Sequence, residues 1–180
     1  MLKRDERSSR AFAFLMAMAV AQASASAQPQ KEDNQEPANQ QELEQKACGP
    51  KGAKSSARTD KKNHLTPEAP VDMALVYVVR PTMMGNKVQT KLGVDGQWLG
   101  VNRGNNYFYV TLRPGEHYLC SQAENRSVIA MSVEAGKTYY LQQKITMGFM
   151  KARNRLEVLD ESDGQKQVAK AHLSILEEKP

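Results

Sequence analysis

The chain has 180 residues and a formal net charge of +5, and two of its residues are cysteines. This length suits a single domain, and 25 Lys and Arg against 20 Asp and Glu is too even a balance for a nucleic-acid partner, which would need a basic stripe with exposed aromatics. Neither cysteine lies in a CxxC pair, so we expect no redox-active thiol pair, and we expect no zinc site and no cofactor.

The first 27 residues have the three parts of a secretory signal peptide. Lys3, Arg4 and further basic residues precede an unbroken apolar run over residues 11–21, and residues 25–27 (ASA) form a small-residue cleavage pattern. A membrane-spanning helix needs roughly 20 apolar residues, so we expect no stable membrane span. The pattern predicts cleavage after Ala27 and a periplasmic or secreted product. The alternative is an amphipathic N-terminal helix of a cytoplasmic protein.

Residues 28–70 are polar throughout. They contain no Phe, Trp or Tyr, and Leu43 and Leu65 are their only large aliphatic residues. Acidic residues gather in the first half and basic residues in the second. Such a stretch buries too little apolar surface to offset the entropy of ordering it. We therefore expect a disordered polar spacer, whose composition also allows a short helix around residues 40–46.

Cys48 lies in this spacer and Cys120 in the region that follows. Export would carry both into an oxidising compartment, where an even number of cysteines favours disulfide formation. The simplest arrangement is one disulfide between Cys48 and Cys120, which in a chain-entropy treatment stabilises the fold by up to ~4 kcal/mol. The alternatives are two separate thiols or an intermolecular bridge.

From residue 71 onward, short stretches rich in β-branched and aromatic residues alternate with turn formers. Residues 73–80 lie between two prolines and indicate a strand buried on both faces. Residues 90–94 and 97–101 flank Asp95-Gly96, which is typical of a type I′ hairpin turn with positive φ at both positions. Further strands are predicted over residues 107–112, 117–121, 128–134, 138–145 and 156–160. Seven or eight short strands predict an all-β fold, a small antiparallel β-sandwich over residues 71–160.

The pattern within residues 107–112 separates two faces. Phe108, Val110 and Leu112 point one way and the two tyrosines the other, which predicts one core face and one mixed face.

The tail, residues 161–180, is open to two interpretations. Val168 and the apolar residues after it fit a helical stripe with Ser162 as its cap, although Gly164 weakens a helix, and residues 172–176 equally fit a last strand.

Several motifs in this region occur in an order and spacing that resemble one family. They are Gly93-Val94-Asp95-Gly96 with Leu99-Gly100, Tyr107-Phe108, RPGEH at residues 113–117 and EAGKTYY at residues 134–140. Together they resemble the bacterial domain-of-unknown-function family 2846 over roughly residues 74–159. The resemblance implies an exported protein or a lipoprotein, and it does not indicate any particular activity. The same order is similar to PEGA-type surface modules, which implies a sandwich of transthyretin-like character.

Two groups of residues suggest binding. Trp98, Tyr107 and Tyr109 are candidates for one shared solvent-facing sheet surface, where rings stack on sugars or on a partner protein. The alternative is that a second layer of the sandwich covers them.

The second group lies in the loop that follows residue 146. Phe149 with Lys151, Arg153 and Arg155 combines an apolar tip with a basic stem, a pattern that suits an anionic membrane surface or polymer. The alternative is an ordinary hairpin loop with a basic base.

No catalytic motif stands out. The chain has no GxSxG, no HExxH and no glycine-rich phosphate loop, and its three histidines are scattered. We therefore predict an exported, non-enzymatic module with a binding or structural role in the cell envelope, whose partner is an envelope protein or polysaccharide. The alternative is a small envelope hydrolase or enzyme inhibitor, for which Glu116, His117 and Glu134 are the candidate site residues.

Overall fold

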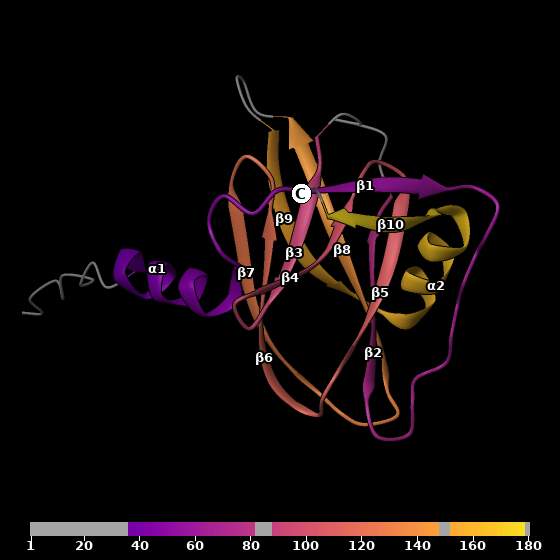
Figure 1. Ribbon diagram of the computed structural model, residues 1–180. Helices are drawn as coiled ribbons and strands as arrows, with labels where there is room; N and C mark the ends of the chain where they lie inside the picture. Colours follow the sequence, from indigo (N-terminus) through magenta and orange to yellow (C-terminus); the bar gives the residue numbers. More distant parts are fainter. Residues whose placement is uncertain (1–35, 82–87, 148–151, 179–180) are drawn as a thin grey trace, which may run out of the picture. The chain divides into compact units, whose positions relative to one another are not determined.

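The computed structural model describes residues 36–81, 88–147 and 152–178 (Figure 1). Over these residues the chain forms a six-stranded sheet with strand order β1-β10-β5-β2-β8-β9 and a four-stranded sheet with order β4-β3-β6-β7. The elements are α1 (Glu36–Ala47), β1 (Ser55–Asp60), β2 (Ala74–Arg80), β3 (Thr90–Val94), β4 (Gln97–Asn102), β5 (Asn106–Leu112), β6 (Gly115–Gln122), β7 (Arg126–Val133), β8 (Thr138–Met147), β9 (Ala152–Leu159), α2 (Glu161–Lys170) and β10 (His172–Glu178).

The predicted all-β sandwich is confirmed. Each strand expected between residues 73 and 160 corresponds to one of β2 to β9, and the described residues add β1 and β10 to make ten strands. The signal peptide, residues 1–27, lies outside the described residues and stays a prediction. Among the described residues, no helix is both long and apolar enough to span a bilayer.

The β3–β4 hairpin has the predicted turn. Asp95 has a φ of 48° and Gly96 a φ of 82°, the positive values that a type I′ turn requires at both central positions. The register of the two strands shifts between Leu92 and Gly93, which forms an irregularity one residue before Val94. The residues of the turn therefore fixed this hairpin. The irregularity lies at Gly93, whose backbone is in close contact with Ala47 at the end of α1.

Most strand pairings are antiparallel, and two are parallel. β2 pairs antiparallel with β5 and parallel with β8, and β10 pairs in parallel with the start of β5 over two residues, His172 and Leu173. A parallel pair needs a long crossover connection. Here the connection from β2 to β8 contains the whole four-stranded sheet, so the spacing of strands in the sequence did not reveal that β2 and β8 are parallel neighbours.

The main core lies between the two sheets. Phe108 and Leu112 of β5 point into it, as the alternation predicted, together with Val76 and Val78 of β2. The other buried members of this core are Ala74, Leu92, Val94, Leu119, Val133, Leu141 and Leu156.

A second core covers the outer face of the six-stranded sheet, where the sequence suggested a mixed surface. Its buried members are Leu75, Tyr77, Val79, Tyr107, Tyr140, Val168, Ala171 and Leu173. Helix α2 packs over β2 and β8, and the extended segment of residues 64–69, which we call the strap, crosses the same face. Every residue of β2 is buried because both of its faces are covered, as predicted.

The expectation of a disordered spacer over residues 28–70 is wrong for its described part. Helix α1 occupies residues 36–47, and β1 pairs antiparallel with β10 from Ser55 opposite Glu178 to Asp60 opposite Leu173. β1 contributes little apolar side chain, with Ala57 as its buried apolar residue. Its order comes from backbone pairing to a strand more than a hundred residues away, which composition does not reveal.

The tail combines both alternatives, since α2 comes first and β10 follows it. The cap of α2 is Asp160 and not Ser162, because the Asp160 carboxylate accepts a hydrogen bond from the Asp163 amide at 2.8 Å. Gly164 lies inside the helix because the ring of Tyr140 packs directly against it, and a Cβ there would lie 2.2 Å from a ring carbon. Gly164, which weakened the prediction of a helix, is therefore the residue through which α2 packs closely against the sheet.

Candidate functional site

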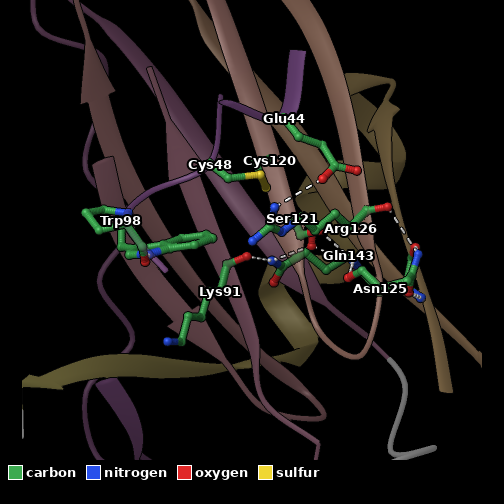
Figure 2. The surroundings of a disulfide bond; sticks show 11 residues. Glu44, Cys48, Lys91, Trp98, Cys120, Ser121, Asn125, Arg126 and Gln143 are labelled. Carbon is green, nitrogen blue, oxygen red and sulfur yellow. Dashed lines mark hydrogen bonds and ion pairs between the residues drawn. A yellow bond between two sulfur atoms is a disulfide. The ribbon is translucent and has the colours of Figure 1, made fainter. Parts of the chain in front are cut away.

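The predicted disulfide joins Cys48, directly after α1, to Cys120 of β6 (Figure 2). The two Cα atoms are 5.0 Å apart and the residues are 72 positions apart in the chain. Cys120 is fully buried, and Trp98, Tyr118 and Val128 pack around the bond on the outer face of the four-stranded sheet. The disulfide therefore fastens the end of α1 to the sandwich.

The chain after α1 approaches the sheet so closely that particular residues are required. A Cβ on Gly93 would lie 2.8 Å from the Ala47 carbonyl oxygen, so only glycine leaves room for this backbone. The ring of Trp98 lies directly against Gly49, and its Nε1 donates to the Pro50 carbonyl at 2.9 Å. Trp98 thus holds the segment that follows the disulfide.

The structure does not bring the three predicted aromatic binding residues together. Trp98 belongs to the four-stranded sheet, whereas Tyr107 and Tyr109 lie in β5 of the six-stranded sheet. Tyr107 is fully buried, and its hydroxyl donates to the Leu65 carbonyl of the strap at 2.9 Å. Burial raises the pKa of Tyr107. The possible shared solvent-facing surface does not form, and the alternative of a covered face holds for Tyr107 and Tyr109, because the strap and α2 cover the face that these two rings occupy.

A chain of buried polar side chains links the two sheets. Gln143 of β8 is fully buried, and its Oε1 accepts hydrogen bonds from Thr90 at 2.9 Å and from Asn102 at 3.1 Å. Its Nε2 donates to Ser121 at 3.0 Å, and the Ser121 hydroxyl in turn donates to Asn154 at 2.6 Å. Figure 2 shows Gln143 and Ser121 near the disulfide. These contacts lie within the fold and hold the sheets in register, which is a structural role.

The edge strands β7 and β9 meet along a seam between the sheets. Asn125 and Asn154 exchange hydrogen bonds, with the Asn154 amide donating to Asn125 Oδ1 at 2.6 Å and Asn125 Nδ2 donating to the Asn154 carbonyl at 2.9 Å. The Leu156 amide donates to the Ser127 hydroxyl at 3.0 Å. Side chains of one edge thereby cap backbone groups of the other, which keeps this edge from pairing with another chain.

Three arginines line a cavity of about 420 Å³ along this seam. We call Arg126, Arg153 and Arg155 the arginine seam. Arg126 forms an ion pair with Glu44 of α1 at 3.1 Å, with both side chains about one-quarter exposed (Figure 2). Arg153 and Arg155 are exposed, and they lie on strand β9 and not in the loop that the sequence predicted, whereas Phe149 and Lys151 lie outside the described residues. Sequence analysis did not identify Arg126 as a member of this site, because Arg126 begins β7 and the whole of β8 separates it from β9 in the chain.

His117 is held on both sides. Its Nδ1 lies 2.6 Å from a carboxylate oxygen of Asp95 in the hairpin turn, and its Nε2 lies 2.7 Å from the Arg113 carbonyl oxygen. Two acceptors suit an imidazolium, which donates from both nitrogens. Desolvation by itself would lower the pKa of His117, but the hydrogen bonds to Arg113 and Asp95 outweigh it and raise the pKa. Among the described residues, no group of three metal-ligating side chains exists.

The fold and these contacts define a class, a disulfide-bonded β-sandwich domain with a helix fastened to one sheet. Residues 70–154 match the family described as "Protein of unknown function (DUF2846)", so the resemblance to that family is confirmed over this region. An uncharacterized protein from Haemophilus influenzae is 26% identical over 101 residues, which cover 56% of this chain. The chain matches 60% of the length of that relative. No solved structure matches, and the PEGA-like character stays a prediction.

Proposed function

We propose that this protein is an exported, non-enzymatic binding module of the cell envelope, and that the arginine seam binds an anionic polysaccharide. The observation that carries the proposal is the exposure of Arg153 and Arg155 beside Arg126 at one cavity. Within the described ranges, the Arg153 guanidinium has no ion pair, and Arg155 has only a long contact of 3.8 Å with Glu157. Guanidinium groups bind carboxylate, sulfate and phosphate groups with two hydrogen bonds each.

Export is supported by the disulfide. A bond between Cys48 and a fully buried Cys120 suits an oxidising compartment such as the periplasm or the extracellular medium. Protein purified from a bacterial host should begin at Gln28, as read by intact mass and N-terminal sequencing. Mature material that still starts at Met1 would overturn this part of the proposal.

The state of His117 supports a non-enzymatic role over the hydrolase alternative. Both of its ring nitrogens are already in contact with oxygen atoms of the fold, those of Asp95 and Arg113, so neither faces a substrate from which it could remove a proton. Glu116 is the residue before it in β6 and faces Ser132 of β7 in the strand pairing, while Glu134 follows β7. His117 is best explained as the residue that fastens the β3–β4 turn to β6.

Charge-matched variants test the binding proposal. R153Q/R155Q should weaken binding to dextran sulfate by about tenfold or more, whereas K166Q/K170Q, which removes the same charge from α2, should leave it unchanged. Neutral dextran is the control for polymer binding without charge, and rising salt should weaken the specific interaction. Equal losses in both variants would show non-specific attraction and overturn the proposal, as would unchanged binding by R153Q/R155Q.

A further inference from the structure

A second cavity opens on the outer face of the six-stranded sheet, between the strap and α2. Its volume is about 700 Å³, which falls in the range of small-molecule sites in proteins. Tyr77 of β2 and Tyr140 of β8 form its floor, with ring centroids 5.4 Å apart and planes within 10° of parallel. We call this cavity the strap pocket. None of its residues belongs to the arginine seam.

The walls of the strap pocket are held in place by the fold. The Tyr77 hydroxyl donates to the Pro67 carbonyl of the strap at 2.7 Å, which fixes the strap on one side. On the other side Gly164 packs against the Tyr140 ring, and the Asp160 cap fixes the first turn of α2. A pocket with fixed walls binds a ligand without the entropy cost of ordering its own segments.

Two carboxylates line the pocket, together with the ring of His64 from the strap. Glu68 comes from the strap and Glu161 from the first turn of α2, and both side chains are exposed. No Lys or Arg lines the pocket, and within the described part of the chain neither carboxylate is in an ion pair. The Gln165 amide donates to the Glu161 carboxylate at 3.0 Å, which orients that carboxylate. An anionic ligand would meet two like charges here, whereas a cation would meet two partners.

The apolar part of the pocket suits the body of such a ligand. Val168 of α2 and Pro67 of the strap line it together with the two tyrosine rings. An aromatic floor and an apolar wall contact a flat or aliphatic group, and aromatic rings also attract cations. We propose that the strap pocket binds an organic cation, a primary amine carried on an apolar body, with Glu68 and Glu161 as the partners of the ammonium group.

Three probes of similar size and different charge test this proposal. Phenethylamine, phenethyl alcohol and phenylacetate share a ring and a short chain but carry a positive charge, no charge and a negative charge. In titrations of the full exported protein followed by calorimetry and by NMR shifts, phenethylamine should bind about tenfold tighter than the alcohol, and phenylacetate weakest. Equal binding of the three probes, or no binding of the amine, would overturn the proposal.

Variants then place the site. E68Q/E161Q should lose the preference for the amine over the alcohol, whereas E116Q/E134Q, which removes the same charge outside the pocket, should keep it. A preference that persists in E68Q/E161Q contradicts the assignment. Because R153Q/R155Q leaves the strap pocket intact, it should bind phenethylamine like the unchanged protein. Failure of the polysaccharide proposal and failure of the amine proposal are therefore distinguishable.

Discussion

The two helices in the described part of the chain, α1 and α2, are held against the sandwich in different ways. α1 is largely exposed along its described side chains, and only its end, at Ala47, is buried beside the disulfide. α2 buries Gly164 and Val168 against the second core without any covalent link. A helix with an apolar stripe is held by burial, whereas a polar helix needs a fixed anchor. We therefore expect the attachment of α1 to depend mainly on cysteine oxidation, and that of α2 to be independent of it.

The largest expected effect separates the two helices. C48A/C120A should lower the free energy of unfolding by up to ~4 kcal/mol, because the loop closed by the disulfide becomes free in the unfolded chain. Urea titration measures this loss, and hydrogen exchange should show α1 exposed while α2 stays protected. A reductant should change the unmodified protein and leave C48A/C120A unaffected. Equal protection of α1 in both proteins would contradict the comparison.

For Gly164 the structure predicts whether a substitution by alanine stabilises or destabilises the protein. Helix propensity by itself predicts that Gly164→Ala stabilises α2 by about 1 kcal/mol. The Tyr140 ring lies where the new Cβ would be, so we expect a net destabilisation of about 1–2 kcal/mol by thermal or urea unfolding. Ser162→Ala, at an exposed position of the same helix, gives the baseline for propensity. A more stable G164A protein would show that α2 is not packed as described.

A substitution at Gly93 tests the docking of α1 from the side of the sheet, because Gly93 belongs to β3 and lies against Ala47. Gly93→Ala should lower the free energy of unfolding by about 1 kcal/mol, because its Cβ would press on the Ala47 carbonyl. In the C48A/C120A background, where α1 is released, the same substitution should have almost no effect. This double-mutant cycle measures the coupling directly. Additive losses would mean that Gly93 acts within the sheet and not through α1.

The smallest expected effect is the pH dependence from His117, which involves neither helix and serves as a reference. Its pKa is raised above the ordinary 6.5 by the hydrogen bonds to Arg113 and Asp95, against desolvation. Its contribution to stability is therefore fully present below about pH 6.5 and is lost as the pH rises through the folded-state pKa. Urea titrations from pH 5 to 9 should show that H117Q loses this decline. D95N, which keeps a turn-forming residue, should reduce it.

Sequence reasoning succeeded where a structure depends on neighbouring residues, or where the chain offers few possible partners. Asp95-Gly96 requires a tight turn whatever lies around it, and a chain with two cysteines has one possible intramolecular pairing. It failed for the aromatic surface, because alternation shows that Tyr107 and Tyr109 share a face but not that the strap covers that face. It found Arg153 and missed Arg126, since their proximity depends on the pairing of Asn125 with Asn154.

By itself the sequence determined the strand positions, the turns and the inward alternation of β5. These follow from backbone preference and from periodicity within a few residues. The tertiary structure alone decided that β1 joins β10, that β2 runs parallel to β8, and that α2 and the strap enclose a pocket. Such features depend on which distant segment satisfies a strand edge or covers an apolar face, and no short pattern encodes that choice.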